Sequence, residues 1–453
     1  MIARGIVRRS LDRRFVVVRK GARLMRRKLS HEFSRTEIEP YSNCRCVRSF
    51  LVYRRARRGK DNLLMRRGLI CRRASLKTRR RNVREIGDTG MSTRPLRFGI
   101  WALVHGSRAA YQDPEEPYDA SWERNRDLVL AAEALGYDST LIAQHTINPH
   151  QEDLDQLEAW SAAAAVAALT SRIEIIAAIK PYLYHPVVLA KLALGIENIS
   201  RGRFAINLVN AWNRPELDKA GIGFAEHDAR YAYGREWITI VSRLMQGERL
   251  TYKGEHFDVR DYLLRPTSLH RPRPLVYVGG ESEPARALVA DHGDVWFING
   301  QPLEDVAGLI ADVAARPRSS APLRFGLSAF VIARRTQAEA QAAYERLLEL
   351  SRKDASMKAI QRQNTDPKVV MMQTMQKSER VGSNGGTAAG LVGSYDDVAA
   401  RIRAFHAAGI ELFMLQFQPF EAEMERFAKE IIPRVRAASS VANDTRALLA
   451  GSQ

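Results

Sequence analysis

The sequence predicts an α/β protein, a (β/α)8 barrel of the TIM type with insertions. From Met91 onward, strand-like and helix-like segments alternate through about eight units in a block of roughly 340 residues. Repeated strand–helix units imply a parallel sheet, and eight units at this length favour a closed barrel over an open doubly wound sheet. In such a barrel the functional groups lie on the loops that follow the strands.

Each expected strand is a short apolar run. The expected strands are 96–104, 139–144, 173–179, 203–210, 275–279, 295–299, 325–333 and 412–417. Segments with helical spacing of apolar residues separate and follow them. The expected helices are 121–135, 154–170, 186–199, 228–246, 285–291, 304–315, 337–353, 395–408 and 421–435. Asp119 or Ser121 is expected to cap the first helix, and Gly136 to end it.

Two insertions interrupt this alternation. Residues 250–260 indicate a small hairpin with its turn at Lys253-Gly254. Residues 354–390 are polar, contain several methionines and end in GSNGGTAAG, which indicates a mobile insertion rather than a domain. We therefore expect three parts: a basic extension over 1–90, a barrel domain over 91–440 and a tail over 441–453.

The net charge of +19 is confined to the extension. Residues 1–90 hold 28 Lys+Arg against 7 Asp+Glu, a net +21, which leaves 70−28=42 basic and 51−7=44 acidic residues, a net −2, for residues 91–453. All three cysteines, Cys44, Cys46 and Cys71, also lie there. The rest of the chain therefore has no disulfide, thiolate nucleophile or cysteine metal site.

Three interpretations of the extension remain open. Its arginine clusters could bind nucleic acid through phosphates, its acid-poor start could be a targeting signal, or it could lie outside the working protein, with translation starting at Met91. We expect the last, and a cytoplasmic protein without nucleic-acid binding. The sequence contains no run of about 18 apolar residues, so it predicts no membrane span.

The stretch from residue 203 to 231 carries the densest set of candidate site residues. Its apolar run contains one amide, Asn207, and a polar loop with Glu216 follows before His227, Arg230 and Tyr231 open a long helical pattern. Strand ends and helix starts gather ligand groups because backbone N–H groups and the helix dipole converge there. The dinucleotide, NTP, zinc-protease and serine-hydrolase signatures are absent, and no His/carboxylate set has metal-ligand spacing.

The remaining polar residues suit a large anionic heterocycle. Arg230 can pair with a phosphate, and Ser282, after two glycines, offers a hydroxyl and backbone N–H groups to the same anion. Gln144, His145 and Asn207 can bond to the edges of a ring. Structural alternatives stay open: Asn207 could tie strands together, and His145 could be an ordinary loop histidine. Arg230 could instead pair with Glu226 or Asp228.

The chain resembles a known family, the bacterial-luciferase-like flavin monooxygenases. The matching stretches are LGYDSTLIAQH, ISRGRFAINLVNAWNRPELDKAG, HDARYAYGREW, VYVGGESEPAR and GTAAGLVGSYDDVAARI. Within the family it resembles the two-component, reduced-flavin group of alkanesulfonate, dimethyl sulfone and pyrimidine monooxygenases. The resemblance covers residues 95–436 and none of 1–90.

The resemblance implies a set of site residues. The flavin contacts that it implies are Gln144, His145, Asn207, Glu216, Arg230, Tyr231 and Ser282. His145 and His227 would handle protons, with a pKa near the working pH. Two departures stand out: Ala211 occupies a position that is often glycine, and the cysteine of the alkanesulfonate type is missing. Lys180 and Arg380 are candidates for an anionic substrate.

The resemblance also implies a reaction. Reduced FMN from a separate NAD(P)H-dependent FMN reductase would react with O2 to give a C4a-peroxyflavin, which residues 354–390 would cover against water. Oxygenation of a small alkanesulfonate or sulfone would then release sulfite or sulfinate and an aldehyde. The alternatives are the same chemistry on a nitrogen heterocycle or other xenobiotic, deazaflavin-dependent hydride transfer, and flavin storage without catalysis. A homodimer or homotetramer is expected, and no metal.

Overall fold

The computed structural model describes residues 94–107, 109, 112–353, 363–370, 373 and 379–450, with backbone alone from 438 onward. The expected extension over 1–90 and most of 354–378 lie outside the described residues. In the described part of the chain, no helix is both long enough and apolar enough to cross a membrane.

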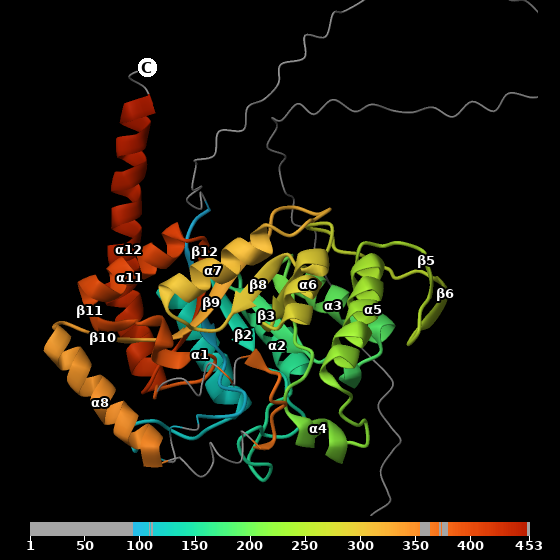
Figure 1. The fold of residues 1–453 in the computed structure, drawn as a ribbon, viewed down its shortest axis with the longest axis horizontal. Helices are drawn as coiled ribbons and strands as arrows, with labels where there is room; N and C mark the ends of the chain where they lie inside the picture. The colour runs from blue at the N-terminus through green and yellow to red at the C-terminus, as the bar shows by residue number, and fades with distance from the viewer. Residues whose placement is uncertain are drawn as a thin grey trace, which may run out of the picture. The chain divides into compact units, whose positions relative to one another are not determined.

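Eight parallel strands close into a barrel, which confirms the predicted fold class (Figure 1). The strands are β1 (Arg97–Trp101), β2 (Ser139–Ile142), β3 (Glu174–Ile179), β4 (Phe204–Leu208), β7 (Leu275–Gly279), β8 (Val295–Ile298), β9 (Arg324–Phe330) and β12 (Ile410–Gln416). Their order around the barrel is β1-β12-β9-β8-β7-β4-β3-β2. The first and last strands therefore pair directly, with Phe98 opposite Phe413, and leave no open edge.

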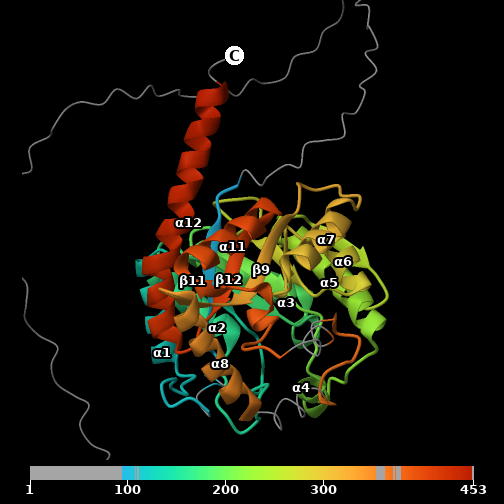
Figure 2. The same ribbon diagram turned by 60° about the vertical axis from the view of Figure 1, so that its left-hand side comes forward.

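Helices follow the strands and pack on the outside of the barrel (Figure 2). They are α1 (Trp122–Leu135), α2 (Ala159–Leu169), α3 (Pro186–Ile199), α5 (His227–Met245), α6 (Glu283–His292), α7 (Leu303–Ala314), α8 (Gln337–Lys353), α11 (Tyr395–Ala407) and α12 (Phe420–Ala450). Ser121 caps α1 by accepting a hydrogen bond from the Arg124 backbone N–H at 3.2 Å, and Gly136 ends it with a left-handed φ of 88°. This confirms the predicted start and stop of the first helix.

Smaller elements decorate the barrel. The predicted hairpin forms as β5 (Leu250–Lys253) and β6 (Asp258–Tyr262) beside α5, and the short helix α4 (Arg214–Lys219) follows β4 (Figure 1). A separate pair, β10 (Ile332–Arg334) and β11 (Val392–Ser394), lies next to α8. The expected strand 325–333 is thus two strands.

Two expected boundaries differ from the structure. The helix expected from residue 154 begins only at Ala159, because Glu158 caps α2 by accepting from the Trp160 and Ser161 backbone N–H groups. The boundary expected after residue 440 falls inside α12, which continues to Ala450.

Two hydrophobic layers hold the barrel together. One fills its interior with side chains that point inward from the strands. These are Leu141, Ile176, Ala205, Tyr277, Val295, Phe297, Leu412 and Met414. The second and larger layer lies between the strands and the helices, where Trp160 and Phe204 pack edge to face. Burial of this apolar surface is the main force that stabilises the fold.

The amino end of the barrel is closed by a buried polar cluster. Glu174 accepts hydrogen bonds from Arg97 and from the Tyr277 hydroxyl, both at 2.9 Å. These groups pair with one another at the amino end, whereas ligands of such barrels bind at the carboxyl ends of the strands.

The glycine-rich end of the 354–390 insertion packs tightly rather than forming a hinge. Residues 386–389 form the short helix η3, and Val381 is buried beside it. Gly385 has a φ of 89°, and a Cβ atom added to it would overlap the Gly300 backbone. The Gly300 N–H in turn donates to the Asn384 carbonyl at 3.0 Å. These glycines are therefore required by close packing against the loop after β8.

Candidate active site

A buried cluster of three ionisable side chains joins the loops after β2, β3 and β4. The Lys180 ammonium lies 2.8 Å from the Glu216 carboxylate, and His145 Nδ1 lies 3.2 Å from each of them. A neutral imidazole can either donate from Nδ1 to Glu216 or accept at Nδ1 from Lys180. Donation to Glu216 makes Nε2 the acceptor of His145.

Backbone groups complete this cluster. Lys180 also donates to the Gln144 carbonyl, while the Gln144 side chain accepts from the Lys180 backbone N–H at 2.8 Å. The Thr146 backbone N–H donates to Glu216 at 2.8 Å. Gln144 and Glu216 thus fix the relative positions of three loops, and Lys180 is held inside the protein rather than offered to a substrate. The other candidate for an anionic substrate, Arg380, is also buried and donates to the Gly385 carbonyl.

The three side chains shift one another's ionisation. Burial alone raises the pKa of Glu216, but the hydrogen bond from His145 and the charge of Lys180 outweigh it and lower that pKa to about 2. Burial, followed by the charge of Lys180, lowers the pKa of His145 to about 4. The environment of His145 is therefore strongly rather than modestly perturbing, and this imidazole is neutral at pH 7. Burial also lowers the pKa of Lys180.

A small cavity of about 40 Å³ lies beside the starts of α5 and α6. It is lined by Ala211, His227, Arg230, Tyr231, Gly280, Ser282, Asn299, Val369 and Val370. The His145 ring packs edge to face on Trp212, the neighbour of Ala211, at 5.6 Å between ring centres. The candidate residues thus form two neighbouring groups, one around Glu216 and one around this cavity.

His227 and Tyr231 form one wall of the cavity from the first turns of α5. Their ring centres are 4.9 Å apart, and His227 Nδ1 lies 2.9 Å from the Asp228 carboxylate. Burial raises the pKa of Tyr231, so its hydroxyl remains protonated at neutral pH. Gly280 has a φ of 108°, and a Cβ atom there would meet the Tyr231 hydroxyl at 2.9 Å.

Arg230 is almost completely buried and is held by neither of the acids expected from the sequence. Its Nε donates to the Asn210 carbonyl at 3.1 Å and its Nη1 to the Ala225 carbonyl at 2.6 Å. Its Nη2 forms an ion pair with Asp366 at 2.7 Å, and the Phe224 ring lies 4.0 Å from its guanidinium carbon.

Several buried polar atoms at this end of the barrel have no well-aligned hydrogen-bond partner among the described residues, including both side-chain polar atoms of Asn210. They also include the hydroxyl of Ser282, beside the Tyr231 hydroxyl, and the side-chain oxygen of Asn207 on β4. Ser282 is also the N-cap of α6, where the first backbone N–H groups of the helix accumulate. Because an unpaired buried polar atom is costly, these atoms mark places where a polar ligand would be bound.

Glu281 braces the loop that carries Ser282. Its carboxyl group is buried and accepts from the Asn299 backbone N–H at 2.7 Å and from the Gln301 side chain at 3.0 Å. Burial raises the pKa of Glu281 to about 7. This side chain therefore ties the loop after β7 to the loop after β8, with Asn299 on the cavity wall.

Ala211, the expected departure, is strained. It is buried, lines the cavity and has a φ of 57°, which costs a residue with a Cβ about 1–2 kcal/mol relative to the right-handed conformation. Its methyl group narrows the wall of the cavity at a point where a glycine would leave space.

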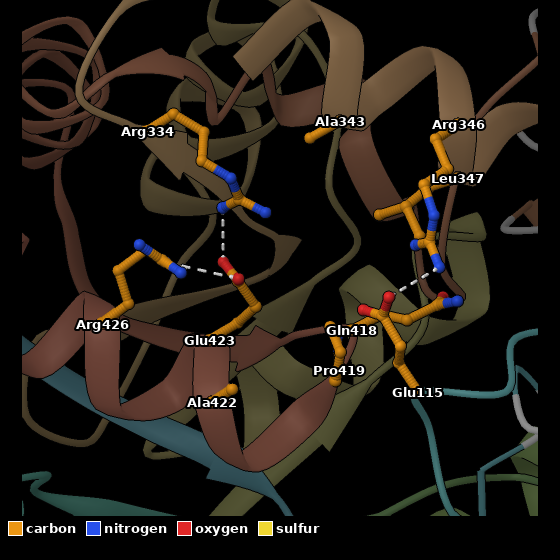
Figure 3. Close-up of a pocket in the computed structure, with 10 residues that line it drawn as sticks. All are labelled: Glu115, Arg334, Ala343, Arg346, Leu347, Gln418, Pro419, Ala422, Glu423 and Arg426. Atoms are coloured by element: carbon orange, nitrogen blue, oxygen red, sulfur yellow. Dashed lines mark hydrogen bonds and ion pairs between the residues drawn. The ribbon is translucent and has the colours of Figure 1, made fainter. Parts of the chain in front are cut away.

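A larger cavity of about 340 Å³ lies between α8 and the start of α12 (Figure 3). Arg334 and Arg426 both face Glu423 there, at 2.6 and 3.3 Å, and Arg346 faces Glu115 at 3.6 Å. Arg346 also pairs with Asp113 at 2.7 Å, so each of the three guanidinium groups is already engaged by a carboxylate of the protein.

The fold and site define a class of protein, a barrel enzyme with ionisable groups at the carboxyl ends of its strands. The chain belongs to the luciferase-like monooxygenase family, whose model matches residues 96–412.

Curated relatives in this family are flavin monooxygenases. The chain is 28% identical over 363 residues to an FMNH2-dependent dimethylsulfone monooxygenase of Pseudomonas fluorescens (strain Pf0-1), which covers 79% of this chain and 99% of the relative. It is 28% identical over 354 residues to the enzyme of the same name from Pseudomonas putida, covering 76% and 96%. Among solved structures, long-chain alkane monooxygenase (LadA) has the same fold with a TM-score of 0.62, at 18% identity over 77% of this chain and 92% of that one.

Sequence reasoning missed two residues of the site, Asp366 and Glu281. Asp366 lies in an irregular polar segment far along the chain from Arg230, and no local pattern links them. Glu281 directly precedes Ser282 in the stretch VYVGGESEPAR. Its position next to a predicted ligand group could have indicated a role in the site. Lys180 was noticed but expected to serve a substrate.

Proposed function

We propose that the protein is a reduced-FMN-dependent monooxygenase that oxygenates a small organosulfur compound of the sulfone or alkanesulfonate type. Membership of the luciferase-like monooxygenase family supports the flavin chemistry. The name shared by the two Pseudomonas relatives supports the substrate class, with nearly their whole length aligned. The absence of cysteine from residues 91–453 favours the sulfone over the sulfonate.

The residues at the carboxyl end of the barrel fit FMN. The observation that carries the proposal is the group of buried polar atoms without a well-aligned partner among the described residues, which includes Ser282 Oγ just after Gly280 and Asn207 Oδ1 beside Gly279. Ser282, the start of α6 and Arg230 would bind the phosphate, and Tyr231 would lie beside it. Asn207 would bond to the flavin ring system.

The chain's own residues would then manage protons and water. When bound, the reduced flavin supplies the electrons with which O2 is activated. Neutral His145, oriented by Glu216, would accept a proton at Nε2, while Gln144 and Lys180 keep that pair in place. His227, on the cavity wall, would exchange a proton with the ligand. The apolar Val369 and Val370 would help to exclude water from the reaction.

The overall reaction would balance as dimethyl sulfone plus O2 plus FMNH2 giving methanesulfinate, formaldehyde, FMN and water. One oxygen atom enters a C–H bond of the substrate and the other leaves as water. The C–S bond of the hydroxylated carbon then breaks, sulfinate leaves with the electron pair, and the hydroxyl proton is lost as the carbonyl forms.

Product analysis tests this proposal. The protein is incubated with an NAD(P)H-dependent FMN reductase, NADH, FMN and dimethyl sulfone, and sulfinate and formaldehyde are measured. We expect both in equal amounts, and expect Ser282→Ala to raise the concentration of FMN required. Parallel reactions test the other substrate classes, with methanesulfonate in one and a pyrimidine in the other. Oxygen consumption that yields only hydrogen peroxide with every substrate would contradict the proposal.

We also propose a separate reductase partner, a cytoplasmic location and a homo-oligomer. The oligomer is supported by three exposed apolar side chains on the outer face of α3, Val188, Leu192 and Ile199. Their spacing places them along one side of the helix, as at helix-mediated interfaces.

A further inference from the structure

The guanidinium of Arg230 is already bound to an anion that belongs to the protein itself. Asp366 forms the ion pair at 2.7 Å, and both side chains are buried, Arg230 at 1% exposure and Asp366 at 11%. Burial alone raises the pKa of Asp366, but the hydrogen bond from Arg230 outweighs it and lowers that pKa. Asp366 is therefore ionised and occupies the place on Arg230 where an external anion would bind.

Asp366 belongs to a segment that also forms part of the cavity wall. Residues 363–370 are attached to the start of α4, where the Arg214 backbone N–H donates to the Asn364 carbonyl at 3.0 Å and Asn213 pairs with Thr365. Val369 and Val370, a few residues beyond Asp366, line the cavity. The ion pair thus fixes the position of this apolar wall.

The cavity is too small for the ligand that its polar groups would attract. About 40 Å³ holds little more than one or two water molecules, whereas a phosphate ester enters with its attached chain. The other walls are strand ends and the first turns of α5 and α6, which are held by the barrel. Among the described residues, the segment 363–370 is joined to the site through the Arg230–Asp366 ion pair and the start of α4, and it is the wall that lies outside the barrel.

We propose that Asp366 competes with the phosphate of an incoming ligand for Arg230, and that the phosphate displaces residues 363–370 from the cavity. This inference rests on the proposed function in taking the phosphate ester to be FMN. A carboxylate and a phosphate on one buried guanidinium repel each other, so binding of the phosphate weakens the ion pair between Arg230 and Asp366. Asp366 is a positioning residue: it keeps Arg230 oriented and covered until the ligand arrives.

The affinity ratio between FMN and riboflavin isolates the phosphate, because the two flavins differ in that group alone. Both are titrated by fluorescence into the wild-type chain, Asp366→Asn and a control, Asp218→Asn, which removes an exposed carboxylate from nearby α4. We expect the FMN-to-riboflavin ratio to rise roughly tenfold in Asp366→Asn, since losing a competing ion pair is worth on the order of 1.4 kcal/mol. The ratio in Asp218→Asn should equal that of the wild type. An unchanged or lower ratio in Asp366→Asn would overturn the inference, since Asp366 would then be a permanent support for Arg230.

Hydrogen exchange of the unmutated chain separates this inference from the proposed function. We expect inorganic phosphate to increase amide exchange within residues 363–370, and riboflavin to leave it unchanged. If flavins do not bind but phosphate still increases exchange there, the proposed function fails and the competition stands. If FMN binds without any change in exchange or in the affinity ratio, the competition fails and the proposed function stands.

Discussion

At the scale of single residues, the defining feature is a charged cluster buried where the strands of the barrel end. Lys180 and Glu216 are both removed from water, and each is tolerated because the other neutralises it. His145 remains neutral beside them because burial and the Lys180 charge disfavour a second positive charge. The same three side chains therefore hold three loops together and set the protonation state of the candidate base.

Replacement of Glu216 tests this arrangement. Glu216→Gln leaves the Lys180 ammonium buried without a counter-charge, so we expect the free energy of unfolding to fall by roughly 3–5 kcal/mol at pH 7. The double variant Glu216→Gln/Lys180→Met should lose less free energy of unfolding than the single variant, because it leaves no unpaired buried charge. Chemical denaturation measures both, with Asp218→Asn as an exposed control on the same helix. Equal losses in Glu216→Gln and the control would contradict a buried ion pair.

The same pair predicts a pH dependence. The pKa of Glu216 is lowered in the folded state, so its contribution to stability is present above the ordinary value of 4.5 and is lost as the pH falls toward about 2. We therefore expect the difference in unfolding free energy between the wild type and the double variant to shrink as the pH falls through this window.

At the scale of elements, the end of the 354–390 insertion is part of the barrel's packing. Residues 379–390 lie against β9 and the loop after β8, and a Cβ atom added to Gly385 would overlap the Gly300 backbone. The glycines are there because a side chain would not fit, not because the chain must bend at them. This separates the insertion into a packed end and the cavity-facing segment 363–370.

A pair of glycine replacements distinguishes packing from hinge motion. We expect Gly385→Ala to cost about 2 kcal/mol or more, because Ala is strained at a φ of 89° and its methyl group overlaps the Gly300 backbone. Gly308 lies in the middle of α7, where a Cβ atom would meet open space. Gly308→Ala should therefore increase the free energy of unfolding by about 0.5–1 kcal/mol. Thermal or urea unfolding provides both values. A neutral Gly385→Ala would mean that residues 379–390 are loosely held.

At the scale of the whole molecule, the barrel leaves one helix incompletely covered. The inner side of α3 packs on the strands and on α5, while Val188, Leu192 and Ile199 remain exposed on its outer side. We expect Leu192→Glu to shift the protein from an oligomer toward a monomer, because a carboxylate buried at an interface costs several kcal/mol. Light scattering after size exclusion measures the mass. Ile222→Glu, an equally exposed position after α4, is the control, and a monomeric wild type would rule out the proposed interface.

Much of the architecture could be predicted from the sequence by itself. Alternating apolar runs and helical segments predict eight strand–helix units, because buried parallel strands need apolar side chains on both faces. Ser121, Gly136 and Pro186 mark the ends of helices for local reasons, since a cap or a fixed φ acts within one turn. The motifs around Asn207, Arg230 and Ser282 likewise locate the site, as they follow strands whose carboxyl ends must share one edge of the barrel.

Only the tertiary structure decides how these residues pair. Glu226 and Asp228 are closer to Arg230 in sequence, yet Asp366 is its ionic partner, because the chain returns over the cavity after more than a hundred residues. The ionisation of His145 and Glu216 depends on Lys180 from another loop and on burial by all three loops, neither of which a local pattern contains. Composition and spacing determine which elements form and where they end, whereas charge pairing, pKa and cavity size depend on distances between segments that meet only in the folded chain.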